Sequence, residues 1–149
     1  MPLSIGDIAP NFTANDTNGK PISLSDYASK PVVIYFYPKD DTPGCTKEAC
    51  SFRDNYDQYL SKGIAVLGVS MDGEDSHHAF TEKFNLPFPL LSDVNGAVTQ
   101  AYDVQGEKNG MRYATRVTYV IGADGKISQV YTSVNTETHA TDILSAIAI

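Results

Sequence analysis

The chain has 149 residues, of which 42% are hydrophobic, enough to form a globular domain with a substantial core. Its formal net charge of -7 argues against nucleic acid or an anionic membrane as the main partner, because both would repel an acidic protein. No apolar run approaches the roughly 20 residues that cross a bilayer, so we expect no membrane insertion. We predict one domain over residues 1–149.

The chain contains two cysteines, Cys45 and Cys50, and three histidines. Two cysteines this close together do not make the disulfide framework of a small secreted protein. The first residues show no cationic and apolar leader, so we expect a cytoplasmic location. His77, His78 and His139 combine with the cysteines at no recognisable zinc spacing. We therefore predict solvated surface histidines, no metal and no cofactor.

The first half of the chain predicts a hairpin followed by a strand, a helix and a second strand. Turn-forming residues separate segments 12–14 and 21–23, which are expected to pair as an N-terminal β-hairpin. Residues 32–37 and 64–69 are continuously apolar, as expected of central parallel strands that are covered on both faces. Between them we predict a helix over residues 43–60.

The second half of the chain predicts three further helices, at residues 77–84, 95–102 and 137–147. Residues 105–113 are rich in Gly, Lys and Asn and are interpreted as a loop. Strands at 117–121 and 127–131 should form a second hairpin. Strands that alternate with helices early in the chain, with a hairpin near its end, predict an α/β fold whose mixed central sheet is flanked by helices.

The segment at residues 38–50 carries both cysteines and follows the first predicted central strand. Thr42 suits a helix N-cap, Pro43 suits the first helical position, and Gly44 lets the backbone approach a ligand. Cys45 then lies in the first helical turn, where unpaired N–H groups and the helix dipole favour a thiolate. We predict a nucleophilic cysteine; the alternative is a buried structural one.

The spacing of apolar residues in this helix predicts that Cys45 faces inward. The residues that share its face are Ala49, Phe52, Tyr56 and Leu60. Cys50 lies five residues on, which turns it by about 140° and puts its Cα roughly 8 to 9 Å from that of Cys45. A disulfide needs Cα atoms closer than about 7 Å. If the two cysteines pair, this part of the helix must therefore unwind.

These residues resemble a known family. The pattern Pro38-x-x-x-Thr42-x-x-Cys45 resembles the peroxiredoxin active-site motif, and residues 44–50 resemble the bacterioferritin comigratory protein, or peroxiredoxin Q, branch. The similarity covers nearly the whole chain and includes residues 9–12, 24–27, 86–93 and 116–121. The resemblance implies a thioredoxin-like fold and a thiol peroxidase that reduces hydrogen peroxide and organic hydroperoxides.

Peroxide reduction needs a nucleophilic thiolate, a polar pocket for the developing negative charge, and a way to recycle the sulfenic acid. The resemblance implies that Cys45 is the peroxidatic cysteine. It also implies that Cys50 resolves the sulfenic acid through an intramolecular disulfide, which thioredoxin or a similar dithiol reduces. The alternative is an inert Cys50, with an outside thiol resolving Cys45.

Two other residues of the motif are assigned to the pocket. The hydroxyl of Thr42 would hydrogen-bond the thiolate and the peroxide; it is also suited to cap the helix, and both roles can coexist. Pro38 would shield the thiolate from bulk water, although a proline that closes a strand is also ordinary turn chemistry.

A cation beside the thiolate would stabilise it, and the chain has three arginines. Arg53 lies eight residues beyond Cys45, about 12 Å along the helix axis, and is too remote. Arg112 falls in the predicted loop, so we choose Arg116, which matches the family segment; its alternative is an ion pair with a surface carboxylate. Glu48, one turn beyond Cys45, would orient Arg116, or would instead be an exposed glutamate near the positive end of the helix dipole.

Two other function classes remain open. A disulfide oxidoreductase uses Cys-x-x-Cys at the helix start, whereas four residues separate the cysteines here. A redox sensor or binding module would use the same cysteine switch to change a partner surface. The resemblance implies a monomer, and we see no C-terminal extension with a further cysteine to exchange between subunits.

Overall fold

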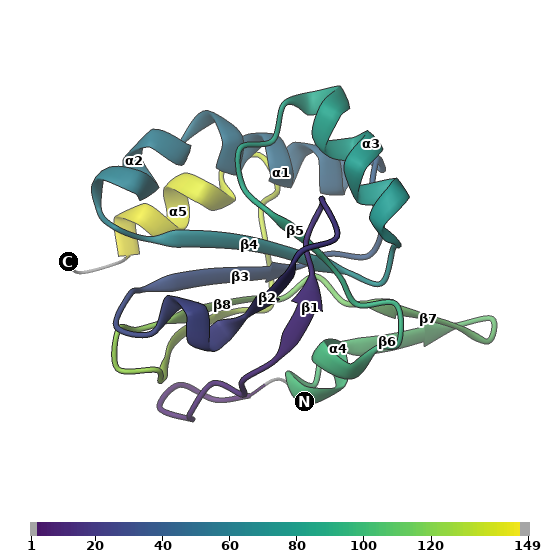
Figure 1. Ribbon diagram of the computed structural model, residues 1–149. Coiled ribbons are helices and arrows are strands. Elements are labelled where there is room, and N and C mark those ends of the chain that lie inside the picture. Colours follow the sequence, from purple (N-terminus) through teal and green to yellow (C-terminus); the bar gives the residue numbers. More distant parts are fainter. Residues whose placement is uncertain (1–2, 147–149) are drawn as a thin grey trace.

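The computed structural model describes residues 3–146, which form a central seven-stranded sheet with helices on both faces (Figure 1). The strands are β1 (Thr13–Asn15), β2 (Pro21–Ser23), β3 (Val32–Phe36), β4 (Ala65–Ser70), β5 (Leu90–Ser92), β6 (Gln105–Lys108), β7 (Met111–Ala114), β8 (Thr118–Ile121) and β9 (Ile127–Tyr131). The helices are the 3₁₀ turn η1 (Leu24–Tyr27) and α1 (Pro43–Asp54), α2 (Tyr56–Ser61), α3 (Glu74–Phe84), α4 (Ala97–Ala101) and α5 (His139–Ala146). The strand order is β2-β1-β5-β4-β3-β8-β9, and β6 and β7 form a separate hairpin.

The two apolar runs form the centre of the sheet. β3 and β4 pair in parallel, with Val32 opposite Ala65 and Phe36 opposite Val69, and β8 pairs with β3 in the antiparallel direction. Every residue of β3 is buried because helices cover both faces of the sheet. The predicted mixed sheet, both predicted hairpins and the parallel pairing of the central strands are confirmed.

Alternate residues of β3 pack into two different cores. Val33 and Tyr35 belong to the core beneath α1, α2, α3 and α5, whereas Ile34 and Phe36 belong to the core that contains residues of α4 and the N-terminal segment. Figure 1 shows α1, α2 and α5 above the sheet and α4 below it. Both cysteines lie on α1, so the cysteine site belongs to the first of these faces.

The helix predicted over residues 43–60 is two helices, because the chain leaves the helical conformation at Asn55. The side-chain amide of Asn55 donates to the carbonyl of Ser51 at 2.8 Å and occupies an acceptor at the end of α1. Beyond the break, Tyr59 is buried, whereas Leu60 is 57% exposed, so the predicted apolar face is wrong at Leu60.

The loop predicted at residues 105–113 is in fact the β6–β7 hairpin. Asn109 and Gly110 form its turn, with φ angles of 53° and 78°. Asn-Gly between two extended segments is a strong hairpin signal. It was missed because these strands are largely exposed and carry few of the apolar residues that mark a strand.

Two of the three histidines are buried, so the prediction of solvated surface histidines is wrong for them. The exposed fractions of His77 and His139 are 0% and 1%, whereas His78 is exposed. His77 lies on the face of α3 that packs on β5, and His139 lies where α5 packs on α1. Each finds polar partners inside the protein, which makes burial of its ring tolerable.

The remaining elements differ from the prediction mainly in their ends. α3 begins three residues earlier than predicted, and α5 begins at His139; the predicted helix end at residue 147 lies outside the described residues. No helix in the described part of the chain combines the length and the apolar character needed to cross a membrane.

Candidate active site

Cys45 lies in the first turn of α1, just beyond the end of β3. The loop after β3 turns into the helix at Thr42, and the N–H of Thr46 donates to the Thr42 carbonyl at 2.8 Å. Pro43 stands in the first turn, where a missing N–H costs nothing. Cys45 is only 1% exposed and packs in the core beneath α1, so the prediction that it faces inward is confirmed.

The guanidinium of Arg116 connects Cys45 with Glu48. Its Nη2 donates to the Cys45 sulfur at 3.2 Å, and its Nη1 donates to Oε1 of Glu48 at 2.7 Å. Arg116 precedes β8, which pairs with β3, so the side chain reaches the start of α1 from the neighbouring strand. Of the other arginines, Arg112 is exposed on β7 and Arg53 donates to the carbonyl of Phe84.

Glu48 is fully buried, which excludes the alternative of an exposed helical glutamate. Burial raises the pKa of Glu48 from 4.5 to about 7, although the adjacent Arg116 lowers it. For Arg116 the opposite balance holds: burial lowers its pKa, but Glu48 and Cys45 more than offset this, so the pKa is raised. Burial therefore works against the charged form of Glu48, and the contact with Arg116 offsets this only in part.

His139 is a neighbour of this pair that the sequence did not reveal. Its Nε2 lies 2.8 Å from Oγ1 of Thr118 and 3.7 Å from Oε2 of Glu48, an oxygen without a hydrogen-bond partner among residues 3–146. Burial lowers the pKa of His139 to about 4; Asp142 raises it and Arg116 lowers it further. No spacing signal could have found this residue, because 91 positions separate it from Glu48 in the chain.

Thr42 and Pro38 lie on the loop that leads into the helix, and both are half-buried. The backbone of Thr42 has the extended conformation of an N-cap, but its side chain makes no capping hydrogen bond. Its hydroxyl instead donates to the carbonyl of Lys39 at 2.9 Å. Thr42 is therefore the N-cap residue, as predicted, but its hydroxyl does not cap the helix. The two lone pairs of the hydroxyl oxygen remain available as acceptors.

Gly44 leaves room for the close approach of Arg116. A Cβ added at Gly44 would lie 3.1 Å from Nη2 of Arg116, the same atom that donates to Cys45. The sequence suggested that Gly44 lets the backbone approach a ligand. The structure shows that it makes room for the guanidinium.

Cys45 and Cys50 are both free thiols on the same continuous helix. Cys50 is half-buried; burial raises its pKa, which the nearby Arg53 lowers and Asp54 raises. Five residues apart on an intact helix, the two sulfurs cannot bond. Residues 43–50 would have to leave the helical conformation first.

Comparison with known proteins identifies the family. Residues 5–130 match the model of the AhpC/TSA family. The putative peroxiredoxin bcp of Coxiella burnetii is 44% identical over 148 residues, which cover 97% of this chain and 98% of that protein. The chloroplastic peroxiredoxin Q of Triticum aestivum is 46% identical over 129 residues, 87% of this chain; the match spans only 59% of that longer relative.

Two solved structures resemble the whole chain. A cysteine-to-serine mutant of Xylella fastidiosa PrxQ is 33% identical with a TM-score of 0.91, and the alignment covers 97% of this chain and 94% of that one. The bacterioferritin comigratory protein of Xanthomonas campestris, studied for its alkyl peroxide reduction activity, is 34% identical with a TM-score of 0.86 and the same coverage. The fold is thus thioredoxin-like, as the resemblance implied, and the chain belongs to the AhpC/TSA family of thiol peroxidases, in its peroxiredoxin Q or Bcp branch.

Proposed function

We propose that this protein reduces hydrogen peroxide and organic hydroperoxides through Cys45. The observation that carries the proposal is the guanidinium of Arg116, 3.2 Å from a buried cysteine sulfur at a helix start. The thiolate attacks one peroxide oxygen, the O–O bond breaks, and Cys45 becomes a sulfenic acid. The leaving oxygen takes up a proton and departs as water or an alcohol.

The neighbouring residues have distinct parts in this step. Arg116 stabilises the thiolate, which lies 3.2 Å from its Nη2, and offers the same positive group to the negative charge that develops on the leaving oxygen of a peroxide at this sulfur. Glu48 holds the guanidinium in place through its 2.7 Å contact with Nη1. Thr42 offers its hydroxyl oxygen to the bound peroxide, and Pro38 limits access of bulk water to the sulfur.

Cys50 completes the cycle in this proposal. Its sulfur attacks the Cys45 sulfenic acid, water leaves, and an intramolecular disulfide forms. Because the bond cannot form on an intact helix, the first turns of α1 unwind in every cycle. Glu48 lies inside the unwinding segment, so its contact with Arg116 breaks at the same time.

We propose a thioredoxin-type dithiol as the reductant, because exchange with a dithiol returns both cysteines to thiols. Such a cycle needs a compartment where dithiols are kept reduced, such as the cytoplasm. The alkyl peroxide reduction activity of the Xanthomonas relative supports organic hydroperoxides as substrates. We expect a monomer, which size-exclusion chromatography with light scattering will test on both the reduced and the oxidised protein.

The decisive experiment measures intact mass before and after one equivalent of hydrogen peroxide. The reduced wild type should lose two hydrogens, Cys50→Ser should gain oxygen, and Cys45→Ser should not change. Steady turnover with thioredoxin should then accompany peroxide consumption. An unchanged wild-type mass would refute the peroxidase proposal, and a mass change without turnover would favour a redox sensor.

A further inference from the structure

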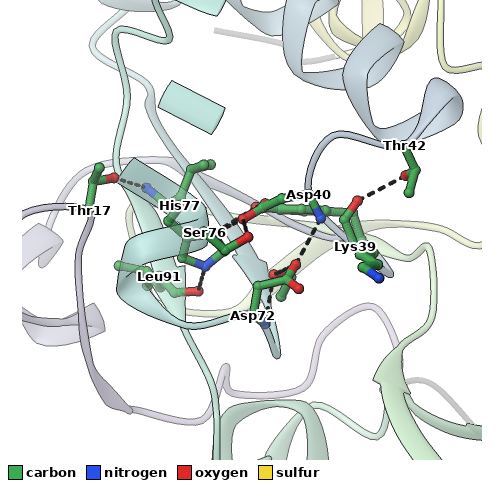
Figure 2. Close-up of polar contacts among 11 residues, drawn as sticks. Thr17, Lys39, Asp40, Thr42, Asp72, Ser76, His77 and Leu91 are labelled. Carbon is green, nitrogen blue, oxygen red and sulfur yellow. Dashed lines mark hydrogen bonds and ion pairs between the residues drawn. The ribbon is translucent and has the colours of Figure 1, made fainter. Parts of the chain in front are cut away.

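A second buried polar cluster lies on the loop that leads to Cys45, and the proposed peroxidase cycle makes no use of it (Figure 2). Its centre is Asp40, 6% exposed, which faces His77 of α3, 0% exposed. Nδ1 of His77 lies 2.6 Å from Oδ2 of Asp40. Asp40 precedes Cys45 by only five residues, so whatever holds Asp40 also holds the entry to α1.

Both oxygens of Asp40 accept hydrogen bonds from other elements. Tyr37, directly after β3, donates to Oδ1 at 2.6 Å, and Ser76 of α3 donates to Oδ2 at 2.8 Å. The backbone N–H of Asp40 donates to Oδ2 of Asp72 at 2.8 Å, and Ser70 donates to the same oxygen. The loop is thus tied to the ends of β3 and β4 and to α3.

His77 extends the network to β5. Its Nε2 lies 2.9 Å from the carbonyl oxygen of Leu91, and because a carbonyl only accepts, Nε2 must carry a proton and donate it. On the other side of the ring, Nδ1 faces Oδ2 of Asp40. The ring therefore bridges the loop and the sheet, as Figure 2 shows.

The arrangement does not favour a metal ion. Among the described residues, Asp40, Asp72 and His77 are the group whose ligand atoms, all within 4.8 Å of one another, come close enough to hold one. However, hydroxyl and backbone N–H groups already point at these oxygens. A cation would have to displace these donors, so we interpret the cluster as a hydrogen-bonded brace.

The brace restrains the loop more firmly than the surface contacts beside it. Asp41 forms an ion pair with Lys83 at 2.9 Å, but both side chains are about half exposed, and such pairs contribute little. Buried polar groups are costly to leave without partners, so Asp40 and His77 hold each other in one arrangement. Within the same loop, the hydroxyl of Thr42 donates to the carbonyl of Lys39.

We propose that Asp40 and His77 are positioning residues for the peroxidatic cysteine. They fix where α1 begins, whereas Arg116 approaches Cys45 from β8; the 3.2 Å contact exists only if both elements keep their places. The inference rests on the proposed function of Cys45. Because misplacement of a reacting group by about 1 Å can cost roughly 100-fold in rate, we expect loss of the brace to slow the oxidation of Cys45.

The test measures the rate constant for Cys45 oxidation by hydrogen peroxide in a Cys50→Ser background, which isolates the first step. Asp40→Ala and His77→Phe should each lower it by about 10-fold or more. Asp40→Asn should stay within about 3-fold, because its amide oxygen still accepts from Tyr37 and its N–H group can donate to His77. The matched control is His78→Phe, at an exposed neighbour on α3, which should react like the parent protein.

Circular dichroism and a thermal melt of each variant separate positioning from stability. Folded variants that lack the brace yet react at the parent rate would overturn the inference while leaving the proposed function intact. A parent protein that does not react would instead overturn the proposed function. Should Asp40→Ala fail to fold, Tyr37→Phe removes one hydrogen bond and keeps the ring, and a folded Tyr37→Phe should still oxidise more slowly, by about 3-fold.

Discussion

At the residue scale, the side chain of Arg116 links the candidate nucleophile, Cys45, to the buried carboxylate of Glu48. Arg116 uses one terminal nitrogen for the sulfur of Cys45 and the other for Glu48. A planar guanidinium can serve two acceptors in fixed directions, which a lysine ammonium cannot match. Gly44 leaves space for this group, since a Cβ there would approach Nη2. We therefore expect the site to depend on the planar guanidinium and not only on its positive charge.

Arg116→Lys tests this dependence. We expect the oxidation of Cys45 to slow by roughly 10- to 100-fold, because the lysine keeps the charge but cannot contact Cys45 and Glu48 together. Stopped-flow measurement of peroxide reduction would show the loss. Arg112→Lys, on the exposed β7 strand, is the matched control and should leave the rate unchanged. Equal rates for Arg116→Lys and the wild type would show that positive charge alone suffices.

At the element scale, the proposed peroxidase cycle places two opposed demands on α1. Its first turn has to be formed so that Cys45 meets Arg116, and the same segment has to open so that Cys50 can reach Cys45. The helix is held beyond this segment by contacts that need not break: the N–H of Ala140 on α5 donates to Ser51, and Arg53 binds the carbonyl of Phe84. Before the segment, the brace around Asp40 holds the loop. We therefore expect any opening to be confined to the residues between these two anchors.

Lys47→Gly tests whether the segment between Cys45 and Cys50 has to open before the disulfide forms. Glycine destabilises a helix interior by about 1 kcal/mol, which corresponds to about a 5-fold shift toward the open segment. We expect disulfide formation after peroxide treatment to accelerate by up to this factor, with little change in the oxidation of Cys45. Rapid quench followed by mass analysis would resolve the two steps. Lys47→Ala removes the same exposed ion pair with Glu137 but keeps helical propensity, so it should not accelerate the step.

At the scale of the whole molecule, Glu48 and His139 give stability opposite dependences on pH. The pKa of Glu48 is raised to about 7 by burial, so the folded protein holds this proton more tightly than the unfolded chain does. Its stabilising effect is present below about pH 4.5 and is lost as the pH rises through 7. The pKa of His139 is lowered to about 4, so its effect is present above pH 6.5 and is lost as the pH falls through 4.

Replacing either residue should reveal how the other makes the free energy of unfolding depend on pH. In Glu48→Gln the histidine effect remains, and the free energy of unfolding should rise from pH 4 to 6.5 more steeply than in the wild type. In His139→Gln the glutamate effect remains, and the free energy of unfolding should fall from pH 4.5 to 7. Urea denaturation at intervals of half a pH unit would measure both curves. Parallel curves for the two variants and the wild type would contradict this account.

Local sequence patterns predicted the central strands and the start of α1 correctly, but they did not predict where α1 ends. Runs of apolar residues located β3 and β4, and Thr42 and Pro43 marked the start of α1 within a residue, because caps and strand periodicity are local properties. Local patterns also put Cys45 in the first helical turn. They could not show the break at Asn55, where the side chain competes with the helix for a carbonyl.

By itself, the sequence determined the α/β order, the helix that carries both cysteines and the family to which the chain belongs. Only the tertiary structure decided which polar side chains are buried and with whom. His77, expected on the surface, meets Asp40 across 37 residues of chain, and His139 meets Thr118 across 21. The physical reason is that burial of a polar group depends on whether packing elsewhere in the chain supplies its partner, and residue type and spacing carry no information about that partner.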